Sequence, residues 1–273
     1  MDKDLTLKER MMEIRGTTET VFPQLGYVMV MLDGRGFSKL IKKKYELPFS
    51  NEFIGMMDET AAYLCSNIQN CCFAYTQSDE ITLCLATVKE DSESFFGNRL
   101  SKILSVTASM AAGKFNQLVI SDWIDGPCSR NYLSRMVNDM KLAEFDCKAW
   151  WVDNINDVYA YFLWRQIDCI RNSKQQAAQT YLPHKKLMGL DTNKQIELLK
   201  KEFKIDWNEY EDYKKYGRFI YKESEHYHND KLNVDYERSV WNIHPAFPLM
   251  DDGGRDKFLA LNKIPLLEKE VKK

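Results

Sequence analysis

The sequence predicts an α+β fold built on a ferredoxin-like βαββαβ sheet. Three observations support this prediction: an apolar run that ends in Asp-Gly, two β-rich runs joined by a short polar turn, and helical apolar spacing on either side of that hairpin. In chain order these elements are strand, helix, hairpin, helix and strand, which is the order of the split βαβ fold. We expect the helices of this unit to cover one face of its sheet.

The first strand is predicted over residues 27–33, where YVMVMLD is apolar and rich in β-forming residues and is followed by glycine. A helix is predicted over residues 51–69, because apolar residues recur there at helical spacing. The members of this apolar face are Phe53, Met56, Met57, Ala61, Leu64 and Ile68. Two strands then fit the halves of residues 71–88, and the polar residues Ser78, Asp79 and Glu80 occupy the turn between them.

A second helix is predicted over residues 97–117, and a strand over residues 147–152 completes the βαββαβ unit. The rest of the chain forms a C-terminal extension of helices and strands, in which residues 238–259 contain a strand and a closing helix. The aromatic residues of this tail are expected to lie in the core.

Composition and charge exclude several classes of protein. The 273 residues are 44% hydrophobic and carry a net charge of −2, so the chain is globular and lacks an overall cationic surface for polyanions. The basic run KLIKKKY at 39–45 is a local exception, for which a solvated helix face is the alternative. Seven cysteines without a C-x-x-C pair indicate neither a disulfide framework nor a zinc site. No apolar run has the length of a leader or a membrane span, so we expect a cytoplasmic or mitochondrial protein that does not enter membranes.

The predicted order of strands brings distant carboxylates together. The first strand and the hairpin are neighbours in such a sheet, so Asp33 would approach Asp79 and Glu80. Carboxylates that converge repel each other unless a cation lies between them, and their hard oxygen atoms suit Mg²⁺. Glycines after Asp33 would let the backbone approach a triphosphate. A plain strand-to-loop turn remains the alternative, since Asp-Gly is a common turn dipeptide.

Five segments in fixed order carry a resemblance to a known family: LDGRGFSKL, AYTQSDEITL, FFGNRLSKILSVTAS, EFDCKAWW and YFLWRQIDC. Over residues 8–222 the chain resembles the tRNA-histidine guanylyltransferases and the related 3′–5′ polymerases. The resemblance implies a polymerase-palm fold, two Mg²⁺ ions, ATP and other nucleoside triphosphates as substrates, tRNA as partner and a homotetramer. It also implies a palm catalytic domain over 1–152, and an extension over 153–273 that completes the catalytic unit and contacts RNA.

The resemblance assigns roles to individual positions. It implies that Asp33, the backbone carbonyl of Gly34 and Asp79 bind the metal, and that Asp33, Asp79 and Glu80 form the catalytic group. The implied nucleotide-binding positions are Gly34, Arg35, Gly36, Phe37, Ser38 and Ser78. The positions implied to contact the 5′ phosphate or the RNA are Lys44, Arg99, Lys102, Lys148, Asn172 and Asn208. Arg99 and Lys102 are expected to share a helix face, with two solvated charges as the alternative.

Two departures from the family pattern bear on the reaction. The guanylyltransferases proper follow W-R-Q-x-D-C with H-I-N-N-L-Y-N, whereas residues 170–176 here read IRNSKQQ. This loss resembles the relatives that repair truncated tRNA 5′ ends by templated addition after ATP activates the 5′ monophosphate. Leu47 and Ser50 also replace a lysine and an aspartate that relatives often carry, which leaves the base preference open. Guanosine addition to histidine tRNA, nucleotide cyclisation and RNA binding without catalysis are the alternatives.

Overall fold

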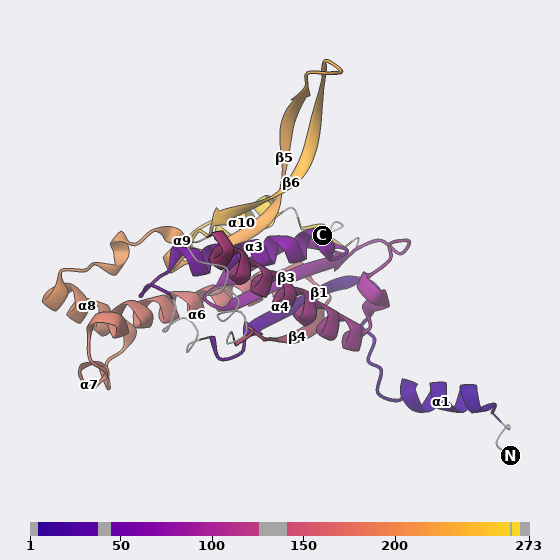
Figure 1. Cartoon of the computed structure of the whole chain (residues 1–273), viewed down its shortest axis with the longest axis horizontal. Helices are drawn as coiled ribbons and strands as arrows, with labels where there is room; N and C mark the ends of the chain where they lie inside the picture. Colours follow the sequence, from indigo (N-terminus) through magenta and orange to yellow (C-terminus); the bar gives the residue numbers. More distant parts are fainter. Residues whose placement is uncertain (1–4, 38–44, 126–140, 263, 268–273) are drawn as a thin grey trace.

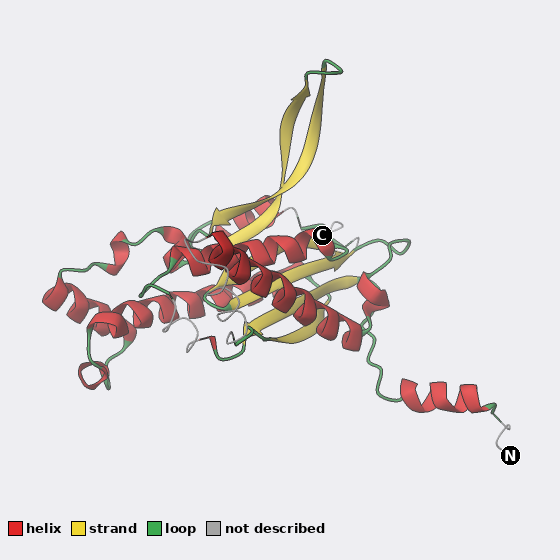
Figure 2. Cartoon of the chain, viewed as in Figure 1, coloured by secondary structure: helices red, strands yellow, loops and turns green. Residues whose placement is uncertain are grey.

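The computed structural model describes residues 5–37, 45–125, 141–262 and 264–267 of the chain. Its helices and strands are drawn in Figures 1 and 2. The strands are β1 (Gly26–Gly34), β2 (Cys71–Gln77), β3 (Glu80–Thr87), β4 (Phe145–Val152), β5 (Arg218–Asn229) and β6 (Val234–Pro245). The α-helices are α1 (Leu7–Gly16), α3 (Asn51–Asn67), α4 (Leu100–Asp125), α6 (Ile155–Tyr181), α7 (His184–Leu187), α8 (Thr192–Phe203), α9 (Asp212–Lys215) and α10 (Gly254–Asn262). Two 3₁₀ helices are η1 (Phe95–Asn98) and η2 (Trp207–Glu209).

A single six-stranded sheet organises the described chain, with the strand order β4-β1-β3-β2-β5-β6 and antiparallel pairing between all neighbours. Its first four strands have the 4-1-3-2 order of a ferredoxin-like unit, so the predicted α+β fold is confirmed. The C-terminal extension adds β5 and β6 at the free edge of β2. Residues 153–273 therefore continue the sheet that residues 1–152 begin.

The expectation that the helices of the βαββαβ unit cover one face is confirmed, and helices of the C-terminal extension cover the opposite face. α3 and α4 pack on the face that presents Val28, Val30 and Leu32, and α6 and α10 pack on the opposite face. Every residue of β3 is consequently buried. A strand buried on both faces reads as a continuous apolar run, which is the pattern that residues 27–32 already show.

The helix expected over 97–117 is shifted toward the C-terminus. Phe96 and Gly97 adopt positive φ angles of 53° and 60°, so the chain is kinked within η1 before α4 begins at Leu100. Several other helices begin at side-chain caps that the sequence supplies, although α7 and α9 have none. Ser50 accepts a hydrogen bond from the backbone N–H of Phe53, and Asn154 accepts one from that of Asp157.

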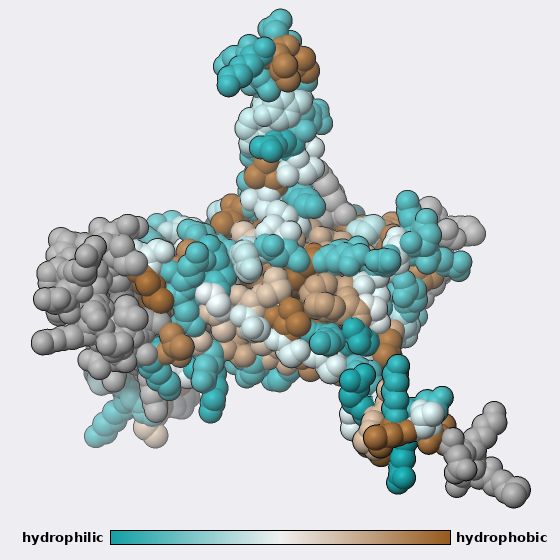
Figure 3. Space-filling model, turned by 45° about the vertical axis from the view of Figure 1, so that its right-hand side comes forward, coloured by the Kyte–Doolittle hydropathy of each residue, from teal (hydrophilic) through white to brown (hydrophobic). Residues whose placement is uncertain are grey.

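Two parts of the chain extend beyond the packed layers (Figures 1 and 3). The far half of the β5–β6 hairpin stands away from the body, and most of its side chains are exposed. α1 also lies apart, and none of its residues is buried. Among the described residues, no helix combines the length and apolarity that crossing a bilayer requires.

Phe258 of α10 tests whether the extension and the palm strands fold as one unit. Its fully buried ring packs against Phe73 of β2, Phe162 of α6 and Phe219 of β5. Phe258→Ala should lower the free energy of unfolding by about 3–5 kcal/mol, because it leaves a cavity where these elements meet. Urea unfolding should show one transition, moved to a lower midpoint.

The matched control is Phe203→Ala on α8, whose residue is 44% exposed. This change should cost less than about half as much, since a partly exposed ring loses fewer contacts. Two separate urea transitions in the Phe258→Ala variant would contradict the single shared core.

Candidate active site

Three carboxylates meet at one end of the sheet. In the observed register Asp33 of β1 lies opposite Glu80 of β3 and opposite Asp146 of β4. Residues directly opposite each other in an antiparallel pair present their side chains on the same face. The backbone N–H of Gly34 also donates to the carbonyl oxygen of Asp79 at 3.0 Å, which ties the end of β1 to the hairpin turn. The expected approach of Asp33 to Asp79 and Glu80 is therefore confirmed.

The turn between β2 and β3 consists of Ser78 and Asp79. Ser78 has a φ of 46°, in the left-handed region that few residues with a β-carbon adopt, and its hydroxyl donates to Asp79 Oδ1 at 3.0 Å. Two-residue hairpin turns commonly need a positive φ at their first central residue, which accounts for this conformation. The turn presents the Asp79 carboxylate beside the end of β1.

Burial and mutual repulsion both disfavour the charged forms of Asp33 and Asp79. Burial and then the charge of Asp33 raise the pKa of Asp79. Burial and then the charge of Asp146 raise the pKa of Asp33, whereas Lys148 and Arg165 act in the opposite direction. A divalent cation between Asp33 and Asp79 would relieve this repulsion.

The donor set suits Mg²⁺ better than a metal held by protein ligands alone. Within the described ranges, no group of three or more His, Cys, Asp or Glu is arranged to hold a metal ion. Mg²⁺ is commonly bound by one or two carboxylates together with water and substrate phosphates, so Asp33, Asp79 and the Gly34 carbonyl fit it.

Glu80 is occupied by a buried cation from the opposite layer. Arg165 of α6 donates to both carboxylate oxygens of Glu80, through Nε at 2.8 Å and Nη2 at 2.5 Å. The same guanidinium pairs with Asp168 at 3.1 Å. Glu80 thus anchors α6 to β3. Its catalytic role stays a prediction, and because its carboxylate is already paired with Arg165, a direct role in metal binding is less favoured for Glu80 than for Asp79.

The residues after Asp33 have different environments. Gly34 lies against Phe37, whose ring atoms would stand 2.6 Å from a β-carbon at position 34, so only glycine fits there. Phe37 itself is buried against Phe53, Phe115 and Phe145. Its ring belongs to the core, and only its backbone remains available to a nucleotide.

The predicted cations are distributed unevenly. Arg35 is exposed and pairs with Glu144 at 2.8 Å, next to Gly36 in the same turn. Lys148 lies on β4 two residues from Asp146, on the face of Asp33. Ser38 and Lys44 lie outside the described residues.

Arg99 and Lys102 are not brought to this end of the sheet within one chain. Arg99 precedes α4, so the expectation of a shared helix face was wrong, and its bridge to Val21 places it near the beginning of β1. β1 runs from there toward Asp33. Lys102 follows in the first turn of α4. Asn208 lies in η2, where its side-chain amide donates to Asp206.

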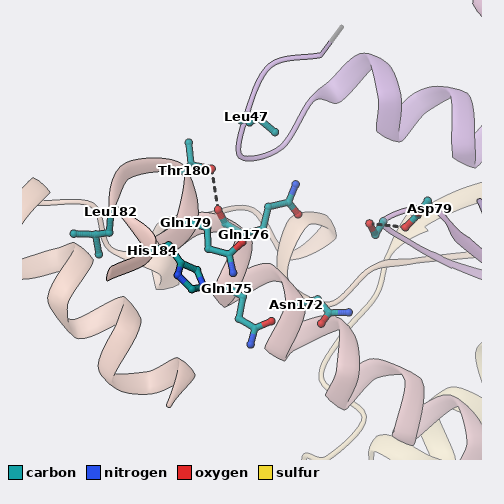
Figure 4. Close-up of a pocket in the computed structure, with 10 residues that line it drawn as sticks. Leu47, Asp79, Asn172, Gln175, Gln176, Gln179, Thr180, Leu182 and His184 are labelled. Atoms are coloured by element: carbon teal, nitrogen blue, oxygen red, sulfur yellow. Dashed lines mark hydrogen bonds between the residues drawn. The ribbon is translucent and has the colours of Figure 1, made fainter. Parts of the chain in front are cut away.

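A pocket of about 480 Å³ opens beside Asp79 (Figure 4). Figure 4 shows Asp79 on one side, amide side chains of α6 opposite it and Leu47 from a separate segment. Its lining residues are Leu47, Ser78, Asp79, Asn172, Gln175, Gln176, Gln179, Thr180, Leu182 and His184. Of the residues predicted to contact RNA, Asn172 therefore joins the site.

Asp146 and Arg165 also belong to the site, although neither was predicted from the sequence. Both lie in segments that carry the family resemblance, but their role depends on tertiary placement. Asp146 was accessible in principle, since a 4-1-3-2 sheet sets β4 beside β1. Arg165 was not, because the layer that α6 forms was unexpected.

Comparison with known proteins identifies similar chains. The family described as Thg1, tRNAHis guanylyltransferase, matches residues 8–153, just over half of the chain. A tRNA(His) guanylyltransferase of Debaryomyces hansenii is 26% identical over 209 residues, which cover 72% of this chain and 74% of the relative. A bacterial tRNA(His) guanylyltransferase-like protein in complex with ATP is similar in structure, with a TM-score of 0.78 and 28% identity over 96% of this chain and 100% of that one. One in complex with GTP has a TM-score of 0.69 and 26% identity, covering 94% and 98%.

The raised pKa of Asp79 predicts that its ionised carboxylate lowers the free energy of unfolding when no metal is bound. Because the pKa is raised, the folded state binds a proton more tightly than the unfolded chain, and ionisation above this pKa lowers stability. In EDTA at pH 7, Asp79→Asn should therefore raise the free energy of unfolding by about 1 kcal/mol. The gain should vanish below the ordinary pKa of an aspartate, near 4. Urea unfolding at several pH values measures it, with the exposed Asp91→Asn as control.

The buried Arg165–Glu80 pair predicts that removing one partner lowers the free energy of unfolding more than neutralising both partners does. Arg165→Met should cost about 3–5 kcal/mol, because it leaves the buried Glu80 without a cation. Glu80→Gln combined with Arg165→Met should recover part of this loss. Arg171→Met is the control, since Arg171 also pairs with Asp168 but is 58% exposed. Equal unfolding midpoints for Arg165→Met and Arg171→Met would exclude a buried charge pair.

Proposed function

Because the chain belongs to the tRNAHis guanylyltransferase family, we propose that it repairs 5′-truncated tRNA by templated addition of nucleotides in the 3′–5′ direction. As a member of this family it is a nucleotidyltransferase that acts at the 5′ end of tRNA and uses nucleoside triphosphates. The proposal adds that ATP first activates the 5′ monophosphate and that the opposing strand selects the incoming base.

The lining of the pocket beside Asp79 carries this proposal. Asn172, Gln175 and Gln176 belong to the segment that replaces the H-I-N-N-L-Y-N motif, and Leu47 replaces the lysine of many relatives. Both departures therefore fall on the same pocket. Amide side chains donate and accept hydrogen bonds, so they can pair with the edges of different bases. Such a lining supports template-directed addition more than selection of one fixed guanosine.

The chain's own residues would position and neutralise the substrates. Asp33, Asp79 and the Gly34 carbonyl would hold Mg²⁺, which supplies charge stabilisation at the phosphates and lowers the pKa of an attacking hydroxyl. Lys148 adds a cation on the same face as Asp33. Arg165 holds the hairpin and α6 together through Glu80, which fixes Asp79 relative to the amides of the pocket.

A defined RNA substrate tests the proposal. The protein is incubated with ATP, all four nucleoside triphosphates, Mg²⁺ and a 5′-monophosphorylated tRNA that lacks its first nucleotide. We expect addition of the nucleotide complementary to the opposing base, favoured over the others by about tenfold or more. The added base should change when the opposing base is changed.

Other outcomes separate the alternatives. Addition of guanosine regardless of the opposing base, seen also with full-length histidine tRNA, would instead support histidine-tRNA guanylylation. A cyclic nucleotide without RNA extension, or RNA retention without any product, would contradict the proposal. Asp33→Asn and Asp79→Asn should each lower addition by about 10²-fold or more with the fold intact.

A further inference from the structure

Arg218, the first residue of β5, is buried between the sheet and α3. Gly217 precedes it with a φ of 82°, and a β-carbon at position 217 would stand 2.6 Å from the carbonyl oxygen of Thr76. Only glycine allows this approach, which sets Arg218 opposite Thr76 in the β2–β5 register. Arg218 Nε then donates to both oxygens of Asp58, at 2.8 and 3.1 Å. Thr76 Oγ1 donates to the same carboxylate at 2.6 Å, so the guanidinium is held in one orientation.

One nitrogen of this fixed guanidinium is left over. Arg218 Nη2 is buried and has no hydrogen-bond partner within the described part of the chain, although the side chain is only 5% exposed. A buried donor without an acceptor is costly, and each such group in a folded protein calls for an explanation. Asp58 and Thr76 explain the orientation of Arg218 but not this free donor.

Arg218 lines a second, smaller pocket of about 50 Å³ that adjoins the first one. The two pockets share Ser78, Asn172 and Gln176 as lining residues. Among the described residues that line it, Lys214 and Arg218 are cations and none is a carboxylate.

Charge and size together define the ligand. Lys214 is paired with Glu211 at 3.1 Å, but Glu211 does not line the pocket, and Asp58 lies behind Arg218. The lining therefore favours an anion. A volume of about 50 Å³ suits a small group, because one water molecule needs roughly 10–15 Å³. A phosphate, with five heavy atoms, is much closer to this size than a purine, which has about twice as many.

We propose that the small pocket binds one phosphate group of a substrate and that Arg218 Nη2 donates a hydrogen bond to it. The identity of that substrate, a nucleoside triphosphate or the 5′ end of an RNA, rests on the proposed function. Asp58 and Thr76 act as positioning residues, because they aim the guanidinium from behind. Asn172 and Gln176 contribute amide groups where the two pockets meet.

Arg218→Lys is the central variant of the test. Lysine keeps the charge beside Asp58, so the buried carboxylate stays paired, but its single nitrogen cannot also serve the pocket. The second variant combines Asp58→Asn with Arg218→Gln, which replaces the ion pair by two neutral amides and keeps an acceptor for Thr76. Arg238→Lys on the exposed part of β6 is the matched control. Circular dichroism and thermal unfolding establish that each variant is folded.

Calorimetry with sodium tripolyphosphate measures binding without any catalysis. We expect Arg218→Lys and the double variant to weaken this binding by about 10- to 100-fold, the effect of losing a hydrogen bond to a charged group. Arg238→Lys should bind as the wild type does. Unchanged affinity in folded Arg218→Lys, or no tripolyphosphate binding by the wild type, would overturn the proposal.

Kinetics distinguish the two sources of the phosphate. A rise in KM for the nucleoside triphosphate alone assigns the pocket to the nucleotide. Loss of the preference for 5′-monophosphorylated over 5′-hydroxyl RNA assigns it to the RNA end. If the wild type adds no nucleotide to truncated tRNA but binds tripolyphosphate in an Arg218-dependent way, the proposed function fails and the phosphate site stands.

Discussion

The antiparallel pairing of β1 with β3 and β4 is the constraint on which the site depends. The register sets Asp33 against Glu80 on one side and Asp146 on the other. Side chains alternate between the faces of a strand, so a slip of one residue would turn Asp33 toward α3 and α4 and bring Leu32 to the carboxylate face. The same slip would exchange the two apolar layers that pack on β1. Core packing and site geometry are therefore fixed by one set of backbone hydrogen bonds.

Two buried arginine–carboxylate pairs join the helices on both faces of the sheet to the strands near Asp79. Arg165 neutralises Glu80 on the face covered by α6, and Arg218 neutralises Asp58 on the face covered by α3. Both arginines come from the C-terminal half of the chain, and both carboxylates come from the N-terminal half. Because an unpaired buried carboxylate is strongly destabilising, the palm strands and the extension depend on each other.

The predicted part of the fold followed from local patterns. The strand at 27–33, the hairpin around Ser78 and the helix from residue 51 were visible in periodicity and turn residues, and their order implied that Asp33 meets Asp79. The predicted site was less complete. Arg99 and Lys102 lie near the beginning of β1 because of the direction in which α4 runs. Sequence motifs alone do not reveal this direction. Phe37 likewise belongs to a nucleotide-binding motif, although its ring is buried in the core.

Tertiary context accounts for what the sequence could not supply. Arg165 and Arg218 lie 85 and 160 residues from the carboxylates that they neutralise. Local propensity carries no information about such partners. The covering of the second face was signalled by the continuous apolar run of β1, but the order of elements alone suggested a single layer. The amides of α6 became recognisable as pocket residues only once α6 was placed beside the hairpin turn.

The β5–β6 hairpin has two mechanically different halves. Near Arg218 it is clamped by pairing with β2, whereas from Lys222 to Ser239 its strands pair only with each other and most side chains face solvent. Local opening free energies are low where few apolar contacts are buried. We therefore expect the distal half of the hairpin to bend independently of its base. Arg218 lies in the base, where β5 pairs with β2, and would keep its position during such a motion.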